Sequence, residues 1–204
     1  MKTEDAPFDP NPPRAFRRAL GAIRYLEQTV TGLSGTTGIA LRYGGFYGPG
    51  NTLGKGGDLV EQVRKRKVPI IGGGTGVWSF VHIDDAALAT VQALDGGGSG
   101  VYNIVDDEPA QVSEWLPALA EAVGGKPPFR IPAWVGCLAV GEFGVIMMTQ
   151  VRGASNARAK RRLGVGAGVA VLARGLSQST GRRRGSGVSE VPFGSPPAMM
   201  WKEP

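Results

Sequence analysis

The stretch WSFVHIDDAALATVQAL, residues 78–94, contains the only histidine of the chain, His82, two residues before the adjacent carboxylates Asp84 and Asp85. Its first residues are typical of a strand, and DAALATVQAL is typical of a helix. On this interpretation Asp84 caps the helix, and Asp85 faces the positive end of the helix dipole. A metal site would need a third ligand, and the sequence indicates none. We therefore predict neither a metal site nor a catalytic cluster at this position.

The same kind of pattern continues on both sides of this stretch. Apolar spacing predicts helices over residues 14–31, 58–67, 84–94 and 113–123, the last capped by Ser113, and strands over residues 38–43, 68–71, 78–83 and 101–105. Strands that alternate with helices favour an α/β architecture with parallel pairing. The glycine-rich stretches GPGNTLG (48–54) and GGGTG (72–76) match neither the dinucleotide fingerprint nor a Walker loop. We interpret both as turns.

Composition argues against a membrane-spanning or secreted protein. The apolar stretch at residues 131–148 contains Glu142 and three glycines. It therefore favours a packing helix over a membrane span. Cys137 is the single cysteine and cannot form an internal disulfide, and the acidic, proline-rich first residues do not resemble a signal peptide. We expect a cytoplasmic protein.

The net charge of +6 is concentrated near the end of the chain. Residues 152–204 contain ten Lys/Arg and two Asp/Glu, whereas residues 1–151 contain 13 Lys/Arg and 15 Asp/Glu. Helical and strand periodicity also ends near Gly164, and Gly, Ser, Arg and Pro dominate the remaining sequence. Such composition is typical of segments that bury too little apolar surface to fold, so we predict a disordered tail over residues 165–204.

Four stretches together resemble a known family. They are LRYGGFYGPG (41–50), WSFVHIDDAALATVQAL (78–94), GVYNIVDDEPAQVSEWLPALAEAVG (100–124) and SNARAKRRLG (155–164). In this order and spacing they are similar to the second half of the NAD-dependent epimerase/dehydratase family, the extended short-chain dehydrogenase/reductases. The resemblance covers residues 1–164. It implies a partial Rossmann-type parallel sheet made of the late strands, with the small C-terminal substrate lobe.

The resemblance also implies roles for individual residues. Tyr43 and Phe46 match positions near the nicotinamide of NAD or NADP. The positions that match the substrate side of the family's cleft are Gly45, Tyr47, Trp78, His82 and Asp84. Gly45 stands where the family has an Asn, and Trp78 stands where it has a phosphate-binding Arg. These two differences disfavour a diphosphate sugar and favour an apolar or aromatic ligand.

Other departures from the family concern catalysis. Members use a Tyr-x-x-x-Lys pair, in which Tyr is the acid/base and Lys lowers its pKa. Aligning Glu27 with the Glu that follows this pair places Ala19 and Ile23 at the two positions, and Tyr25 is out of register. The glycine fingerprint is also absent. We therefore assign no catalytic residue and expect the chain to bind NAD(P) poorly.

These observations support one main hypothesis and two alternatives. The main hypothesis is a truncated NAD(P)-dependent epimerase, dehydratase or reductase of a sugar nucleotide or a related carbonyl or carbinol compound, inactive as written. The first alternative is a catalytically silent binding or regulatory protein of the same fold. The second is a nucleic-acid binder that uses RGASNARAKRR (152–162) and GRRRG (181–185). It is disfavoured because the first cluster matches a helix of the family and the second has no interleaved aromatic residue. We thus expect a small-molecule substrate, no nucleic acid and no membrane.

A further expectation concerns the reading frame of the tail. In the family, R-x-L-G is followed by Gly-Trp-x-Pro and then by a stretch like Ser-Trp-Arg-Glu-Gly-Phe. Codons for residues 164–167 and 171–177, read one nucleotide later, can spell both motifs. We therefore expect residues from about 165 onward to be read in a shifted frame, which makes their basic composition uninformative about partners.

Overall fold

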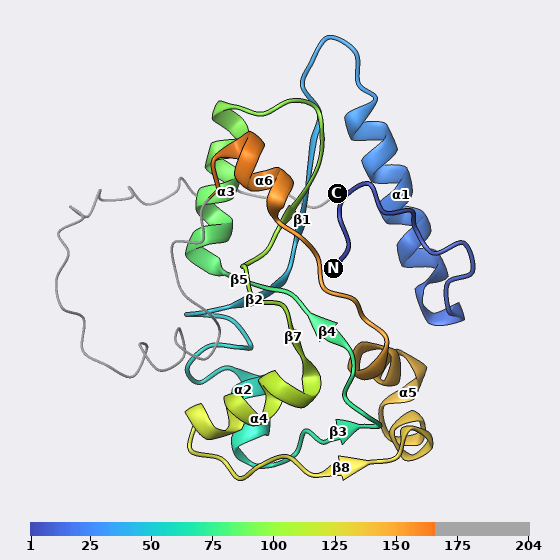
Figure 1. Cartoon of the computed structure of the whole chain (residues 1–204), viewed down its shortest axis with the longest axis vertical. Coiled ribbons are helices and arrows are strands. Elements are labelled where there is room, and N and C mark those ends of the chain that lie inside the picture. The colour runs from blue at the N-terminus through green and yellow to red at the C-terminus, as the bar shows by residue number, and fades with distance from the viewer. Residues whose placement is uncertain (166–204) are drawn as a thin grey trace, which may run out of the picture.

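Eight short strands and seven helices make up the part of the chain that this computed structural model describes, residues 1–165 (Figure 1). The helices are η1 Arg14–Phe16, α1 Arg17–Thr31, α2 Asp58–Arg64, α3 Ile83–Asp95, α4 Val112–Ala122, α5 Ala133–Thr149 and α6 Ala157–Leu163. The strands are β1 Ile39–Tyr43, β2 Gly45–Tyr47, β3 Ile70–Ile71, β4 Val77–Trp78, β5 Phe80–His82, β6 Gly100–Ile104, β7 Ala110–Gln111 and β8 Arg130–Ile131. The predicted α/β class is confirmed. The expectations of disorder and of a shifted frame fall on residues that lie, except for Val165, outside the described part.

The strands pair in four ladders, each of two strands. In the longest, β1 runs parallel to β6 from Ile39 opposite Gly100 to Tyr43 opposite Ile104. Strands β2 and β5 are parallel, as are β3 and β8. Parallel pairing was predicted and holds for these three ladders, whereas β4 and β7 pair antiparallel.

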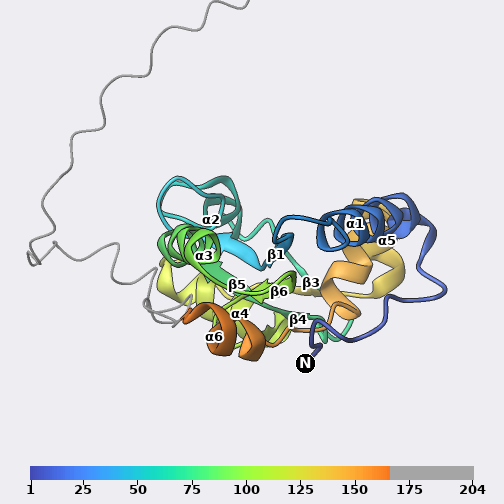
Figure 2. The ribbon, with the colours of Figure 1, turned by 90° about the horizontal axis from the view of Figure 1, so that it is seen from above.

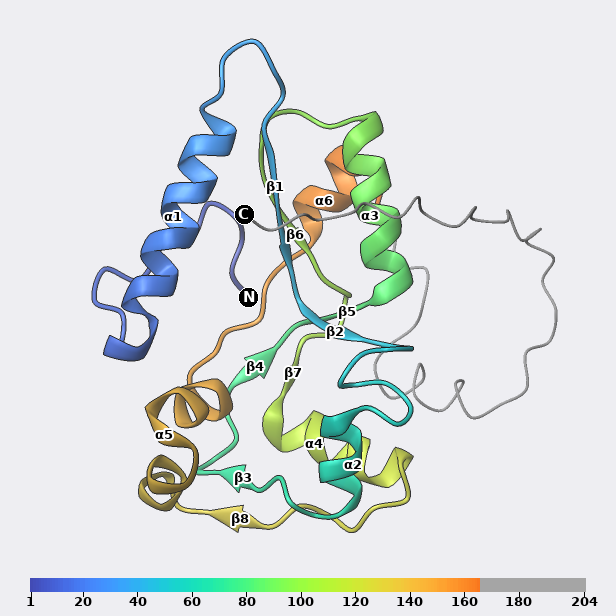
Figure 3. The same cartoon turned by 180° about the vertical axis from the view of Figure 1, so that it is seen from behind.

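The elements gather into two groups, which Figure 3 shows from behind. Helices α1, α3 and α6 surround the β1–β6 ladder, while α2, α4 and α5 lie around the β3–β8 ladder. Strand β5 connects the hydrophobic cores of the two groups, because successive strand residues point to opposite sides. Phe80 packs with Tyr47 and Leu116 in one core, and Val81 packs with Tyr102 in the other.

The start of α3 differs from the sequence prediction. Asp84 was expected to be the N-cap, but the cap is His82, whose extended backbone (φ −67°, ψ 143°) precedes the first helical residue. Its imidazole Nδ1 accepts a hydrogen bond from the backbone N–H of Asp84 at 3.2 Å. The prediction was wrong because a histidine with a free ring nitrogen can fill the role usually taken by Asp or Ser. The Asp84 side chain is 81% exposed instead, with its carboxylate 3.6 Å from Nδ1.

Two other helix ends also differ from prediction. Helix α4 begins one residue before Ser113, after the cap Gln111, whose backbone N–H donates to the Glu114 carboxylate at 3.2 Å. Helix α2 ends at Arg64 rather than at Lys67. Arg66 adopts a left-handed backbone conformation (φ 57°), and the Lys67 N–H returns to the carbonyl of Gln62 at 2.8 Å. This geometry closes the helix.

Helix α5 is the predicted packing helix, with a break in its middle. Gly141 has φ 72° and ψ 178°, so two helical segments meet there at a kink. No helix within residues 1–165 combines the length and apolarity needed to cross a membrane. In Figure 2, which is seen from above, α1 overlies α5. Helix α5 contacts η1, where the rings of Phe143 and Phe16 stack with centroids 4.9 Å apart.

Helix α1 forms where its apolar spacing predicted, but much of its apolar face is open. Ile23 is 45% exposed and Leu26 is 55% exposed. On α5, the side chains of Trp134, Leu138 and Phe143 are also exposed. Within the described residues, α1 and α5 thus present large apolar side chains to solvent.

Candidate functional site

A cavity opens where β1 ends. It has a volume of about 380 Å³ and is bordered by Tyr43, Gly45 and Trp78 together with Val105 and Met147. We call this cavity the head pocket. The residues that border it come from the first residues of the chain, from β1, β2 and β6, from the β4–β5 segment, and from the end of α5 and the segment after it, so both groups of elements contribute to it.

Two aromatic rings, those of Tyr43 and Trp78, border the head pocket. Trp78 uses its only polar atom internally, since its indole Nε1–H donates to the carbonyl of Met147 at 2.8 Å. The Trp78 ring lies 5.3 Å from Trp115 and 6.0 Å from Phe80, so it is held in an aromatic cluster. Tyr43 is anchored as well, because its hydroxyl forms a 2.5 Å hydrogen bond with Thr90 Oγ1. Both residues therefore offer the pocket ring surface rather than polar groups.

A half-buried ion pair fixes one side of this pocket. The guanidinium of Arg42 donates two hydrogen bonds to the carboxylate of Glu27, at 2.5 and 2.6 Å, in a bidentate arrangement. Glu27 is the one buried residue of α1, and Arg42 is on β1, so the pair joins the helix to the strand. The charge of Arg42 is thereby neutralised although the residue borders the pocket.

The first ten residues form the outer wall, which we call the N-terminal strap. The Lys2 N–H donates to the carbonyl of Gly153 at 2.7 Å, and the Ser155 N–H donates to the carbonyl of Lys2 at 2.9 Å. The strap thus lies parallel to the segment before α6, like a short added strand.

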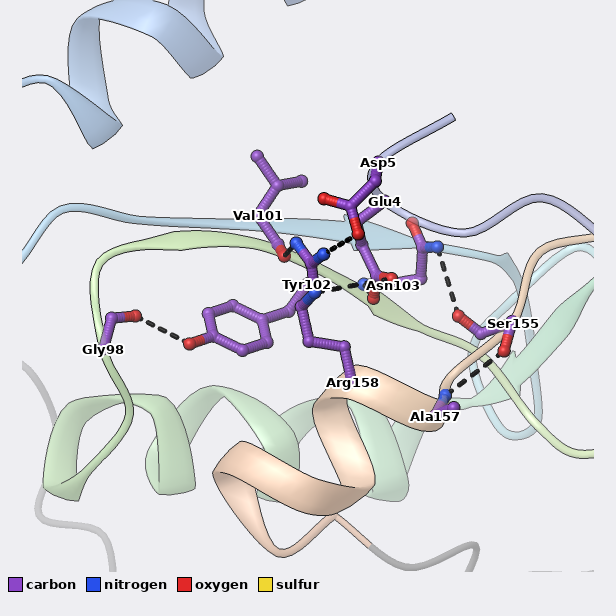
Figure 4. Close-up of polar contacts among 9 residues, drawn as sticks. All are labelled: Glu4, Asp5, Gly98, Val101, Tyr102, Asn103, Ser155, Ala157 and Arg158. Atoms are coloured by element: carbon purple, nitrogen blue, oxygen red, sulfur yellow. Dashed lines mark hydrogen bonds and ion pairs between the residues drawn. The ribbon is translucent and has the colours of Figure 1, made fainter. Parts of the chain in front are cut away.

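Acidic side chains fasten the strap to β6 and α6, as Figure 4 shows. Glu4 is buried and accepts the backbone N–H of Asn103 at 2.9 Å. The Arg158 guanidinium lies 3.8 Å from Glu4, pairs with Asp5, and donates to the carbonyl of Val101 at 3.4 Å. One arginine on α6 therefore connects the strap to β6.

A second cavity continues from the head pocket beneath the strap. It has a volume of about 750 Å³ and includes Phe8, Asp9, Thr75 and Gln150 in its walls. We call it the outer pocket. Lys2, Val151 and Arg152 border both cavities, so the two pockets adjoin one another there.

The structure brings together three of the seven residues that the family resemblance assigned. Tyr43, Gly45 and Trp78 border the head pocket. Phe46 lies beside Tyr43, with ring centroids 5.4 Å apart, and is 39% exposed.

The other three assigned residues lie elsewhere. Tyr47 is fully buried in a hydrophobic core, against the edge of the His82 ring at 5.2 Å. His82 is buried and caps α3, while Asp84 faces solvent. For these three the substrate role stays a prediction, and packing and capping account for where they lie. Sequence reasoning missed Lys2, Arg42 and Arg152 as pocket residues, and isolated cations at distant positions gave no signal that could have found them.

The alignment on Glu27 predicts the positions of the Tyr-x-x-x-Lys pair on α1. Ala19 and Ile23 occupy them, and neither carries a titratable group. Tyr25, on the same helix, is 73% exposed. Among the described residues, no group of three or more His, Cys, Asp or Glu side chains is arranged to hold a metal ion.

Two buried titratable side chains, Tyr47 and Asp106, have polar atoms without a partner in the described part of the chain. The Tyr47 hydroxyl and Asp106 Oδ1 are both buried and have no hydrogen-bond partner within residues 1–165. Burial raises the pKa of Asp106 to about 6, and the nearby carboxylates of Asp107 and Glu108 add to the effect. Burial, followed by the charges of Asp106 and Asp85, raises the pKa of Tyr47.

The glycine-rich loops are turns, as predicted. A Cβ at Gly54 would lie 2.0 Å from the carbonyl oxygen of Gly48, and a Cβ at Gly57 would lie 2.3 Å from that of Asn51. These glycines are required because the loop packs against itself. A Cβ at Gly74 would lie 2.7 Å from the side chain of Ile70, and Gly74 has a left-handed backbone (φ 63°).

Comparison with known proteins identifies the family. The sequence model of the NAD dependent epimerase/dehydratase family matches residues 2–105, so the chain belongs to that family. A 3-diazoavenalumate denitrifying reductase from a Streptomyces species is 38% identical over 162 residues, which are 79% of this chain and 53% of the relative. The chain spans about half the length of that protein. That it represents the second half of the family fold stays a prediction.

Solved structures with low sequence identity establish the fold. A human epimerase family protein with NADPH has a TM-score of 0.68 and 22% identity, over 87% of this chain and 58% of the other. The UDP-glucose 4-epimerase of Thermotoga maritima, with UDP-glucose, has a TM-score of 0.61 and 23% identity, over 86% and 57%. The dTDP-glucose 4,6-dehydratase of Streptomyces venezuelae, with NAD, has a TM-score of 0.63 and 21% identity, over 87% and 52%. The parallel strand pairs therefore belong to a Rossmann-like epimerase fold.

Proposed function

We propose that the chain is the substrate-binding part of an NAD(P)-dependent reductase-type oxidoreductase whose substrate is a small aromatic or apolar molecule with a reducible group. The observation that carries this proposal is the head pocket, whose wall offers the rings of Tyr43 and Trp78 and no side chain at Gly45. Because Arg42 is neutralised by Glu27, it offers no free charge to a diphosphate, and the other cations that border the pocket are Lys2 and Arg152.

The family relatives support an oxidoreductase and favour a reductase. The curated Streptomyces relative is named a reductase of 3-diazoavenalumate, which is not a sugar nucleotide. Solved relatives contain NADPH or NAD, which supports NAD(P) as the cofactor of the complete activity. A sugar nucleotide, as bound by the Thermotoga epimerase, fits the aromatic wall less well.

The described residues fit only one end of such a cofactor. Tyr43 at the carboxyl end of β1 and Phe46 in β2 have adjacent rings, and Rossmann-type folds place their ligands at the carboxyl ends of the strands. The pyrophosphate needs a glycine turn that opens a helix, and the glycine loops described here are filled by their own backbone. We therefore derive no reaction step through the cofactor and assign no catalytic residue.

A catalytically silent binding protein is the second candidate. The residues Ala19 and Ile23 favour it, because neither can move a proton. The same head pocket would then serve recognition of a small molecule without chemistry.

Two titrations of the 204-residue chain test the proposal. Trp78 borders the head pocket, so tryptophan fluorescence should change when a planar aromatic ligand such as trans-cinnamamide binds, and Trp78→Leu should abolish that change. NADH should bind weakly or not at all. Micromolar binding of NADH, or tighter binding of UDP-glucose than of the aromatic probe, would contradict the proposal.

A further inference from the structure

We propose that the junction of the head pocket and the outer pocket is a carboxylate subsite formed by Lys2 and Arg152. The substrate class is then an elongated aryl carboxylate, with its ring in the head pocket and its acid group at the junction. This inference rests on the proposed function, because it assumes an aromatic ligand beside Trp78.

The location of the two cations is the first observation. Lys2, at the start of the strap, and Arg152, after α5, are the two charged residues that border both cavities. A ligand that extends from one cavity into the other must pass between or beside them. The head pocket alone, at about 380 Å³, has the size of sites that take a small organic molecule.

The second observation is that these two cations have no anionic partner within residues 1–165. Neither side chain makes a hydrogen bond or an ion pair there. The nearby acids are already engaged. Glu27 holds Arg42, and Glu4 and Asp5 hold Arg158. Two cations at one junction repel each other unless an anion lies between them.

The charge balance favours a single carboxylate over a diphosphate. Asp9 borders the outer pocket, where its carboxylate accepts the backbone N–H of Asn11 at 2.9 Å. It offsets part of the positive charge of Lys2 and Arg152, which leaves an excess that one carboxylate can balance. The planar guanidinium of Arg152 matches a carboxylate in a bidentate arrangement, and the ammonium of Lys2 supplies a point charge.

The test compares an acid with its neutral analogue. The 204-residue chain is titrated with trans-cinnamate and with trans-cinnamamide, and tryptophan fluorescence is followed. The chain should bind the acid at least about tenfold more tightly than the amide, as expected for a charge-assisted hydrogen bond. Lys2→Gln and Arg152→Gln should each weaken binding of the acid by about tenfold and leave binding of the amide unchanged.

A control variant and the neutral amide distinguish failure of the carboxylate subsite from failure of the proposed function. Arg161→Gln removes an exposed cation that borders neither pocket, and it should change neither affinity. Equal affinity for acid and amide, or an Arg152→Gln variant that loses both, would overturn the carboxylate subsite and leave the aromatic pocket standing. If neither compound binds to the unaltered chain, the proposed function fails, and the subsite fails with it.

Discussion

Asp106 lies just after β6, is 7% exposed, and has one carboxylate oxygen without a hydrogen-bond partner among the described residues. Its pKa of about 6 exceeds its ordinary value of 3.8, so the folded chain holds this proton more tightly than the unfolded chain does. Deprotonation therefore costs the folded state free energy. The contribution of Asp106 to stability falls as the pH rises from about 4 to about 6 and is constant above that range.

Replacing Asp106 with Asn should remove this cost, because Asn resembles the protonated acid in shape and charge. Asp106→Asn should raise the free energy of unfolding above pH 6 by up to about 3 kcal/mol, and the gain should vanish near pH 4. Urea denaturation across this pH range measures the difference.

Asp107 is the matched control, because its shift has the opposite direction. Hydrogen bonds from Lys160 and then Asn156 lower the pKa of Asp107. Asp107→Asn should therefore reduce stability above about pH 4. The effect should be smaller, since the Asp107 side chain is 49% exposed. A pH-independent gain in Asp106→Asn would contradict the burial argument.

The candidate site could be predicted from sequence only where its residues are near one another along the chain or belong to a family motif. Tyr43 and Gly45 follow a recognisable strand, and Trp78 begins the stretch around His82. Lys2 and Arg152 are brought together by the strap. Residues at opposite ends of the described chain share no sequence periodicity. The sequence therefore contains no indication that Lys2 and Arg152 meet at the junction of the two pockets.

At the scale of elements, the ion pairs of Arg158 help to hold the strap, and this predicts a local effect of their loss. Arg158→Gln should speed hydrogen exchange of the Asn103 and Ser155 amides, which donate to Glu4 and to Lys2. Since the ion pairs of Arg158 are partly exposed, the expected increase is about fivefold.

A variant on the same helix controls for this prediction. Lys160 pairs with Asp107 at 2.5 Å and forms no ion pair with the strap's acids within residues 1–165, so Lys160→Gln should leave the Asn103 and Ser155 amides unchanged. Unchanged exchange in Arg158→Gln would show that backbone pairing alone holds the strap.

Helices and strands were predictable as types, and their ends were not. Helix 14–31 and strand 38–43 have apolar spacing that tertiary structure does not alter. The ends depend on single side chains and backbone angles, such as the Nδ1 of His82 and the left-handed Arg66. Residue propensities predict Asp84 as the cap of α3 and Arg66 as part of α2. The hydrogen bond to His82 and the left-handed backbone of Arg66 override these two preferences.

At the scale of the whole molecule, exposed apolar surface predicts self-association of the 204-residue chain. Within the described residues β1 pairs on one edge only, and α1 and α5 leave side chains such as Ile23 and Leu138 exposed. Light scattering should show mass increasing with protein concentration. Leu138→Lys should reduce the association more than Leu33→Lys, which changes a loop residue that is 51% exposed. A sharp, cooperative melt from a monomer would contradict this expectation.

The attachment of the strap also determines when the outer wall of the two pockets is completed during synthesis. Asp5 and Arg158 are 153 residues apart, so Asp5 leaves the ribosome long before its partner has been made. At typical translation rates the interval is roughly 8 to 30 seconds. During that time Glu4 and Asp5 have no arginine to bind, and Lys2 has no segment 153–155 to pair with. The outer wall of the two pockets therefore forms only after α5 and the segment 153–155 have been made, so ligand binding must wait for residues about 150 positions after the strap.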